Sequence, residues 1–249
     1  MTTHLTLPDI SATNSRLYNA LWSQAHLARP ERCNTWSLIS GLLPAAPDRL
    51  EIGPGLRPRL PIAGTHFIDI SSSAIEQLRA KGATALPGLI SALPYNDRTF
   101  DLVCAFDVIE HVQNDQQAFA ELNRVLKDNG TLIVSMPLHT QRWTEFDEWS
   151  GHVRRYDPAD LLTILDDNNL VPVQSAVFGM QPSNPRLLQF GLWCLKHNRR
   201  TAMFFYNRLF MPLGVYFQSR LKVVSGLMDT TGVDEIVLVC RRKVRPQAA

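Results

Sequence analysis

Short apolar segments alternate with helix-compatible segments through the middle of the chain, and this alternation restricts the fold more than any other feature. The apolar segments end at turn residues and read RLEIG, THFIDIS, FDLVCAFDV and TLIVSMP. Between them lie stretches such as SSAIEQLRAKG and DQQAFAELNRVLKDNG. Strands and helices that follow one another in turn predict a parallel sheet covered by helices, an α/β fold.

A glycine-rich turn follows the first apolar segment, and a carboxylate ends the second. Gly53 and Gly55 come directly after this first strand, where missing side chains let backbone N–H groups approach a ligand. Asp69 ends the second strand. Because neighbouring parallel strands end at one crevice, this carboxylate is placed to accept hydrogen bonds from the hydroxyls of a ribose. The two strand ends predict a nucleoside pocket.

The glycine-rich turn departs from the dinucleotide-binding fingerprint. A G-x-G-x-x-G motif that starts at Gly53 requires glycine at position 58, where this chain has Pro58. The following Arg59, Leu60 and Pro61 leave little room for a long helix whose N-terminus binds a pyrophosphate. A nucleoside without phosphate therefore fits better than NAD.

Five motifs in register carry a family resemblance. LEIGPG, FIDIS, FDLVCAFDVIEHV, LNRVLKDNGTLIVSMP and GHVRRYDPADL resemble the successive motifs of class I S-adenosylmethionine (SAM)-dependent methyltransferases, in particular the small-molecule group. The resemblance covers residues 48–178 and 233–242. It implies a Rossmann-like fold with a mostly parallel seven-stranded sheet and a helical insertion before the last strand. It also implies SAM as cofactor and a small-molecule acceptor that takes the methyl group on O, N or S.

The resemblance further implies which residues contact SAM. Glu51 and the two glycines face its methionine end, Asp69 its ribose and Ile70 its adenine. The acidic residue that the family often places after the third strand is missing, so groups around Ile90 and Ser91 are expected to contact the adenine. Asp107 follows the fourth strand, where it is expected to touch the cofactor's amino group or the acceptor. The expected cofactor residues are Glu51, Gly53, Gly55, Asp69, Ile70, Ile90, Ser91 and Asp107.

Three histidines are candidate general bases for an acceptor hydroxyl: His111, His139 and His152. Histidine is the side chain best suited to remove a proton near neutral pH, although a structural role stays open for each. The acceptor is expected to contact the aromatic and basic residues that follow the fifth strand, with loop anchoring as the alternative for the arginines. These residues are Trp143, Arg154, Arg155 and Tyr156. No cluster of metal ligands stands out, so no metal is expected.

We divide the chain into four parts. Residues 1–47 are expected to form an N-terminal helical cap in which Tyr18 and Trp22 either close over the cofactor or pack in the core. Residues 48–178 form the SAM-binding core, 179–232 a helical insertion, and 233–249 the last core strand with a basic tail. Helices are expected near 114–127, 158–168, 184–198 and 201–227, with Pro212 breaking or kinking the last.

The charge distribution separates the C-terminal third from the rest. Residues 168–249 carry 11 Lys and Arg against 3 Asp and Glu, and none of these acids lies between Asp167 and Asp229. Two interpretations stay open for residues 184–228: a cap over an apolar or anionic acceptor, or a surface that touches acidic lipid. No basic run resembles a nucleic-acid motif. The absence of a signal peptide or spanning segment and four widely spaced cysteines lead us to expect a cytoplasmic protein.

Three other functions compete with methyl transfer. A non-catalytic protein on this fold is conceivable because the adenine-binding acid is missing, and a SAM-consuming lyase or cyclase fits the same motifs. An NAD-dependent oxidoreductase is disfavoured by Pro58. Binding measurements with SAM, S-adenosylhomocysteine (SAH) and NAD distinguish the first and last of these from a SAM enzyme.

Overall fold

One mixed sheet organises the computed structural model, which describes residues 7–23, 25–179, 189–191, 193–194, 197–216 and 218–243. Its strand order is β3-β2-β1-β4-β5-β8-β6-β7. The strands are β1 (Arg49–Ile52), β2 (Thr65–Asp69), β3 (Thr84–Pro87), β4 (Phe100–Phe106), β5 (Leu126–Pro137), β6 (Leu170–Val177), β7 (Val224–Ser225) and β8 (Glu235–Arg242). The first five strands pair in parallel, and β8 inserts antiparallel between β5 and β6. The expected α/β fold is confirmed. The sheet has an eighth strand because the two-residue β7 pairs with β6.

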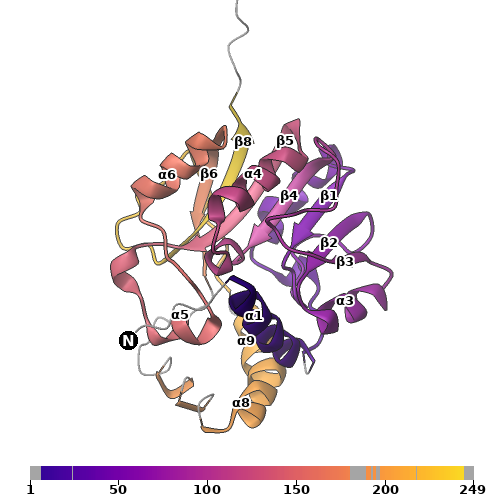
Figure 1. Ribbon diagram of the computed structural model, residues 1–249, viewed down its shortest axis with the longest axis vertical. Coiled ribbons are helices and arrows are strands. Elements are labelled where there is room, and N and C mark those ends of the chain that lie inside the picture. The colour runs from indigo at the N-terminus through magenta and orange to yellow at the C-terminus, as the bar shows by residue number, and fades with distance from the viewer. Residues whose placement is uncertain are drawn as a thin grey trace, which may run out of the picture.

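Helices cover the sheet and one of its edges. They are α1 (Leu7–Trp22), α2 (Trp36–Ser40), α3 (Ser72–Arg79), α4 (Asp115–Val125), α5 (Glu145–Ser150), α6 (Pro158–Asp167), α8 (Arg199–Phe205) and α9 (Met211–Tyr216). In Figure 1, α4 and α6 lie in front of the sheet, whereas α1 lies across the ends at which the parallel strands finish. This position of α1 places its side chains beside the strand tips.

Local sequence signals account for the helices that lie next to the strand tips. The Ser71 hydroxyl caps α3 by accepting the Ala74 N–H, and the Asn114 side chain caps α4 by accepting the Gln117 N–H. The buried face of α4 consists of Ala118, Phe119, Leu122 and Val125, which follow helical periodicity. These helices hold the loops that end β2 and β4 in place.

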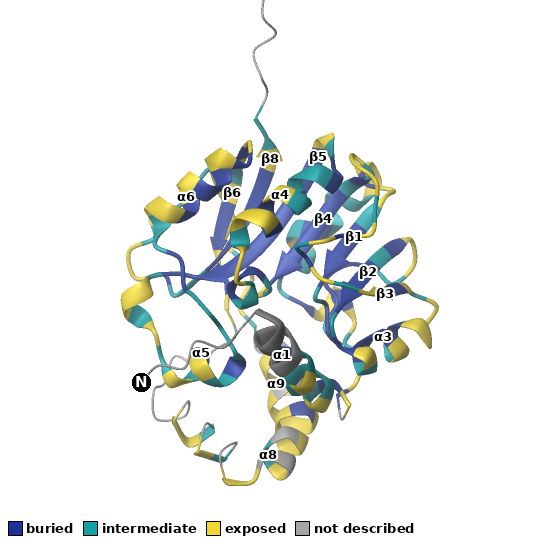
Figure 2. Cartoon of the chain, viewed as in Figure 1, coloured by how far each residue is buried: buried dark blue, intermediate teal, exposed yellow. Residues whose placement is uncertain are grey.

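The core lies on both faces of the sheet. Along β4, Val103 and Ala105 pack on the α4 side, whereas Leu102 and Cys104 pack on the other side. The central strands are dark in Figure 2 because both of their faces are buried. Strands buried on both faces read as continuous apolar runs, which explains why FDLVCAFDV shows no alternation.

The segment before β8 departs from the expected helices. The helix expected over 201–227 ends at Tyr216, and the residues at 224–225 form β7. A π-helical turn over Tyr206–Phe210 separates α8 from α9. Pro212 lacks the N–H that a regular helix would donate to the carbonyl of residue 208, and the widened turn precedes it. The helix expected over 184–198 lies partly outside the described residues. None of the helices in the described part of the chain is long and apolar enough to span a bilayer.

Candidate functional site

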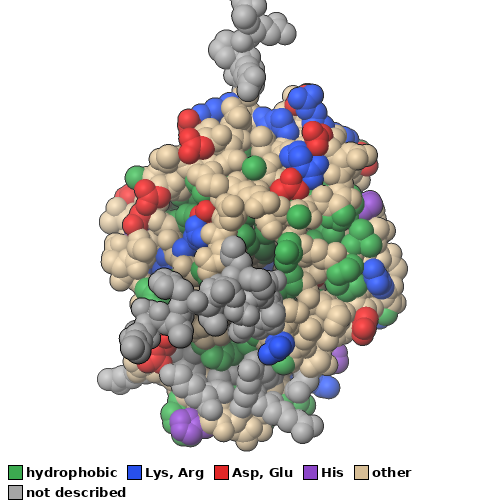
Figure 3. All heavy atoms as spheres, viewed as in Figure 1, with side chains coloured by type: hydrophobic (Ala, Val, Ile, Leu, Met, Phe, Trp, Pro, Cys, Tyr) green, Lys and Arg blue, Asp and Glu red, His purple; other side chains and the backbone are tan. Residues whose placement is uncertain are grey.

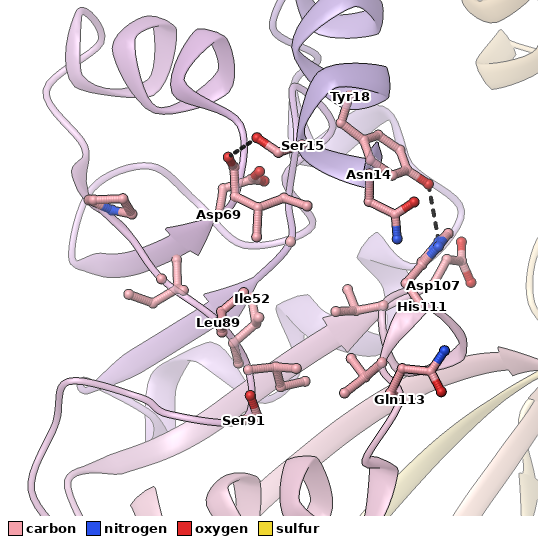
Figure 4. Close-up of a pocket in the computed structure, with 18 of the residues that line it drawn as sticks. Asn14, Ser15, Tyr18, Ile52, Asp69, Leu89, Ser91, Asp107, His111 and Gln113 are labelled. Atoms are coloured by element: carbon pink, nitrogen blue, oxygen red, sulfur yellow. Dashed lines mark hydrogen bonds between the residues drawn. The ribbon is translucent and has the colours of Figure 1, made fainter. Parts of the chain in front are cut away.

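A cavity of about 860 Å³ opens where the parallel strands end. Its volume falls within the range of about 300–1,000 Å³ that is typical of small-molecule sites. The tips of β1 and β2, the loop after β3, the turn after β4 and one face of α1 line it. In Figure 4, Asp69, Leu89 and Ser91 lie on one side of the cavity and Asp107, His111 and Gln113 on the other, with Asn14 and Tyr18 of α1 alongside. Ligands of doubly wound sheets bind at this edge.

The two glycines of the first turn have different structural roles. Gly53 lines the cavity with φ at +64°, and a Cβ there would lie 2.5 Å from a methyl carbon of Val108. Its bare backbone therefore forms part of the cavity wall. Gly55 has φ at +51°, and a Cβ there would lie 2.3 Å from the Trp22 ring. The missing side chain of Gly55 makes room for Trp22 of α1, and the residue itself does not line the cavity.

Asp69 lines the cavity from the tip of β2. One carboxylate oxygen accepts the Gly55 N–H at 2.8 Å, and the other accepts the Ser71 N–H at 2.8 Å. Burial raises the pKa of Asp69, and these backbone hydrogen bonds oppose the rise. Each carboxylate oxygen can accept a further hydrogen bond, so the carboxylate can still receive hydroxyl donors from a ligand.

Glu51 does not reach the cavity, although the sequence suggested a cofactor contact. Its carboxylate is buried and accepts the N–H groups of Arg59 and Leu60. Burial raises the pKa of Glu51 to about 7, against the lowering effect of those hydrogen bonds. Side chains alternate between the two faces along β1, and Glu51 points to the face opposite Leu50 and Ile52. In this position Glu51 fixes the path of the chain after the glycine turn.

The loop after β3 forms an apolar wall. Ile90 and Ser91 line the cavity together with Ile70 from the end of β2. The Ser91 carbonyl accepts a hydrogen bond from the Gln117 side chain of α4 at 2.9 Å, and the Ile70 carbonyl accepts one from Ser15 of α1. The structure brings these three residues together at one cavity, and their contact with a cofactor stays a prediction. Sequence reasoning missed Asn14 and Ser15, because nothing in the helical pattern shows which face of α1 meets the sheet.

Tyr18 and His111 meet at the cavity wall. The Tyr18 hydroxyl lies 3.1 Å from His111 Nε2, and His111 Nδ1 lies 3.1 Å from the Gly151 carbonyl. Since a carbonyl only accepts, Nδ1 carries the proton and Nε2 accepts from Tyr18. Burial, followed by the neighbouring His152, lowers the pKa of His111 to about 3. His111 is therefore a neutral acceptor at neutral pH.

Three carboxyl groups lie close together beside this pair. Asp107 lines the cavity, with φ at +54°, and the Ser135 hydroxyl donates to its carboxylate. Burial and the Asp107 carboxylate raise the pKa of Glu110 well above its usual range. Burial and then Asp107, through its charge and a hydrogen bond, do the same to Glu235 at the start of β8. Sequence reasoning missed Glu235 because only the antiparallel insertion of β8 brings it to this edge.

The other two candidate histidines do not line the cavity. His152 donates from Nδ1 to Asp147 at 2.8 Å, and His139 shares a hydrogen bond with the Thr230 carbonyl at 3.0 Å. In these positions both histidines hold the chain after β5 in place through hydrogen bonds. Their expected role as bases is not supported by contact with the cavity.

The four residues expected to bind the acceptor also lie outside the cavity lining. Arg155 is buried and pairs with Asp147 and Asp234, each at 2.9 Å. Arg154 pairs with Asp115, which also accepts the Tyr156 hydroxyl. Trp143 is 38% exposed. The two arginines and the tyrosine thus anchor the loop, which was the alternative interpretation for the arginines.

Glu110, His111 and His152 form a group that sequence reasoning did not anticipate. One potential metal-binding atom from each lies within 4.8 Å of the others. Both nitrogens of His111 already have hydrogen-bond partners, and His152 Nδ1 is held by Asp147. A metal would have to displace the Tyr18 hydrogen bond or the Gly151 hydrogen bond. In the present arrangement both His111 nitrogens are therefore used in hydrogen bonds within the protein.

Comparisons with known proteins agree with this fold. A family model described as "Methyltransferase domain" matches residues 52–134. The uncharacterized protein YafE of Escherichia coli is 30% identical over 146 residues, which cover 55% of this chain and 68% of that protein. A malonyl-[acyl-carrier protein] O-methyltransferase of Herminiimonas arsenicoxydans is 30% identical over 127 residues, 47% of this chain and 48% of that enzyme. The chain thus spans two thirds of one relative and about half of the other.

A solved structure shares the fold over nearly the whole chain. A SAM-dependent methyltransferase of Thermotoga maritima, described as a possible histamine N-methyltransferase, superimposes with a TM-score of 0.56. It is 17% identical, and the alignment covers 93% of this chain and 92% of that one. At this identity the likeness concerns the fold alone.

Proposed function

The chain belongs to the class I SAM-dependent methyltransferases, and from this premise we propose that it transfers a methyl group from SAM to a small-molecule acceptor. The acceptor would bind where Tyr18, His111 and Asp107 line the cavity. SAM supplies an electrophilic methyl group on a sulfonium. The chain's own task is to hold the two partners in line and to exclude water.

The observation that carries the proposal is the joint position of Gly53 and Asp69 in one cavity. Gly53 offers bare backbone, and the Asp69 carboxylate is held rigidly by two backbone N–H groups. A buried, oriented carboxylate is suited to the two vicinal hydroxyls of a ribose. The residues present therefore fit an adenosyl group.

The apolar wall fits the flat base of the same ligand. Ile70 and the loop residues Leu89 and Ile90 line the cavity without an acidic side chain. Backbone groups of this loop, or the Ser91 hydroxyl, would contact the adenine amino group. The methionine end would then lie toward Gly53 and Asp107, on the side where α1 contributes Asn14.

The histidine on the side of the cavity where the methyl acceptor would bind is a weak base. His111 is the one of the three candidate histidines that lines the cavity, and its pKa is about 3. A general base works best when its pKa lies near the operating pH. We therefore assign His111 and Tyr18 to positioning. This favours an acceptor whose lone pair is free without a base in the site, such as a carboxylate or an amine that binds in its neutral form.

Calorimetry with SAH and NAD tests the cofactor assignment. SAH should bind with a measurable heat and NAD should not, because no helix follows the turn between β1 and β2 to offer its N-terminus to a pyrophosphate. Incubation with isotopically methyl-labelled SAM and a small-molecule extract, followed by mass spectrometry, should then yield a labelled product. Binding of NAD in preference to SAH would contradict the cofactor assignment. SAH binding without any labelled product would point to a binding protein or to a lyase or cyclase.

A further inference from the structure

The helical segment 199–216 exposes an unusual number of large apolar side chains. It comprises α8, the π-helical turn and α9. Its exposed aromatic and leucine side chains include Phe204 (47%), Phe205 (48%), Tyr206 (38%), Leu209 (47%), Phe210 (55%) and Leu213 (45%). Such side chains rarely gather on a surface that faces only water, and a contiguous apolar patch usually marks an interaction site.

The segment is attached to the rest of the molecule by a narrow contact. Asn207 is buried and donates to the Leu21 carbonyl of α1 at 3.2 Å. The Arg57 guanidinium stacks between Trp22 and Tyr206, at 5.1 and 5.3 Å from the ring centres. These contacts fix the segment beside α1. In Figure 1 it extends beyond α1, away from the sheet, and most of it is exposed in Figure 2.

The segment does not cover the cavity. The lining of the cavity includes no described residue between 189 and 228. The interpretation of this region as a cap over the site therefore loses its geometric support, and the apolar side chains need another partner.

The charge of the region identifies the kind of partner. Arg208, Arg220 and Lys222 are exposed, and the sequence has no acidic residue between Asp167 and Asp229. The far end of the molecule differs, because Figure 3 shows Lys, Arg, Asp and Glu side chains mixed there. Ion pairs such as Arg98–Asp128 balance that end. The exposed aromatic helix therefore lies among positive charges that no carboxylate of its own region offsets.

We propose that residues 199–222 form a peripheral docking surface for a bilayer that contains acidic lipids. Aromatic and leucine side chains enter the boundary between headgroups and acyl chains, while Arg208, Arg220 and Lys222 meet the lipid phosphates. A second copy of this chain is the less favourable occupant, because it would bring two positive surfaces together. The acidic bilayer supplies the missing negative charge.

Co-sedimentation with vesicles tests the proposal. The intact chain is mixed with vesicles of phosphatidylcholine alone or of phosphatidylcholine and phosphatidylglycerol in a ratio of about three to one. Binding should require the acidic lipid and weaken as salt is raised, because the Debye length shrinks to about 3 Å at 1 M. Replacement of Arg208, Arg220 and Lys222 by Gln should weaken binding about 100-fold, at about fivefold for each cation.

A second variant removes the apolar contribution, and a third serves as control. Leu209→Ser with Phe210→Ser should weaken binding about tenfold or more, because each exposed side chain then has less apolar surface to bury. Leu162→Ser with Arg241→Gln removes an exposed leucine and an exposed arginine from α6 and β8 and should bind as the unaltered chain does. Circular dichroism and SAH affinity should be unchanged in all variants.

Three results would overturn the proposal. The first is equal binding to both kinds of vesicle, and the second is equal binding by the Gln variant and the control. The third is a concentration-dependent dimer, seen by light scattering, that the Leu209 and Phe210 replacements abolish, which would assign the surface to a second copy. None of these results bears on SAH binding, so the docking surface and the proposed function fail separately.

Discussion

Asp107 is the more exposed of the two carboxylates that line the cavity, and its negative charge can distinguish SAM from SAH. SAM carries a positive sulfonium and SAH a neutral sulfur, so Asp107→Asn should weaken SAM binding more than SAH binding. We expect the ratio of the two affinities to change about two- to fivefold, as is typical of an exposed charge pair. Calorimetry with both ligands measures it. Asp128→Asn, on an exposed side chain of an ion pair at the far edge, should leave the ratio unchanged.

The pKa of His111 is lowered to about 3 in the folded chain, so the free energy of unfolding should depend on pH. The unfolded chain binds this proton near pH 6.5, whereas the folded chain does so only near pH 3. Stability from the neutral His111 is therefore fully present above about pH 6.5 and is lost as the pH falls toward 3. Over this window the free energy of unfolding should fall by up to about 1.4 kcal/mol per pH unit.

Urea unfolding of the unaltered chain and of His111→Gln, from pH 4 to 8, isolates that contribution. The difference between the two free energies of unfolding should grow in favour of the unaltered chain as the pH rises to about 6.5, and then stay constant. Other titrating groups, including Glu51, change in both chains and largely cancel. A difference that does not depend on pH would show that His111 is solvated and titrates normally.

Residues at strand tips could be predicted from the sequence, and residues whose position depends on distant segments could not. Gly53, Asp69 and Asp107 follow apolar runs directly, so the parallel sheet brings them to one edge. Glu51 lies one residue earlier than the tip of β1, where the alternation of a strand turns it away from the cavity. Glu235 reaches the edge only because β8 runs antiparallel.

The docking of α1 over the glycine turn is the relation between elements on which one wall of the cavity depends. Gly55→Ala would place a Cβ 2.3 Å from the Trp22 ring and would strain a backbone with φ at +51°. We expect a loss of about 2–5 kcal/mol in the free energy of unfolding, from left-handed strain and from overpacking together. SAH affinity should fall as well, because Tyr18 and Asn14 reach the cavity from the same helix.

Gly82→Ala is the matched control for this change. Gly82 has φ at +82°, and a Cβ there would meet no atom within 4 Å. Backbone strain alone should cost about 1–2 kcal/mol and leave SAH affinity intact. Chemical denaturation and calorimetry on both variants separate strain from the clash with Trp22. Equal effects of the two replacements would mean that α1 does not rest on Gly55.

Helices with local signals were predicted more closely than those that depend on tertiary contacts. The helix expected over 114–127 is α4 (Asp115–Val125), and the one expected over 158–168 is α6 (Pro158–Asp167). The Asn114 side chain caps α4 and Pro158 begins α6, and both helices have an apolar face. The helix expected over 201–227 ends eleven residues early at Tyr216, since the chain there pairs with β6 as β7 instead. Strand pairing of this kind leaves no mark on helical periodicity.

At the scale of the whole molecule, the cavity and the proposed lipid-binding surface are two separate regions. The cavity and the 199–216 helix lie on either side of α1, which contacts both through Trp22 and Leu21. The parallel part of the sheet and the crevice at its carboxyl ends follow from the alternation of strands and helices. The position of the 199–216 helix does not, because it rests on a single buried amide and on the stacking of Arg57.

The affinity of the Asp69→Asn variant for SAH, measured by calorimetry, tests the central claim most directly. Asn keeps the size of the side chain and removes its charge, and Asp101→Asn at the opposite end of β4 serves as control. The account predicts a loss of about 10- to 100-fold for Asp69→Asn, the worth of hydrogen bonds to a charged group, and none for the control. An unchanged affinity in a folded Asp69→Asn chain would contradict it, because the ribose would then be held elsewhere.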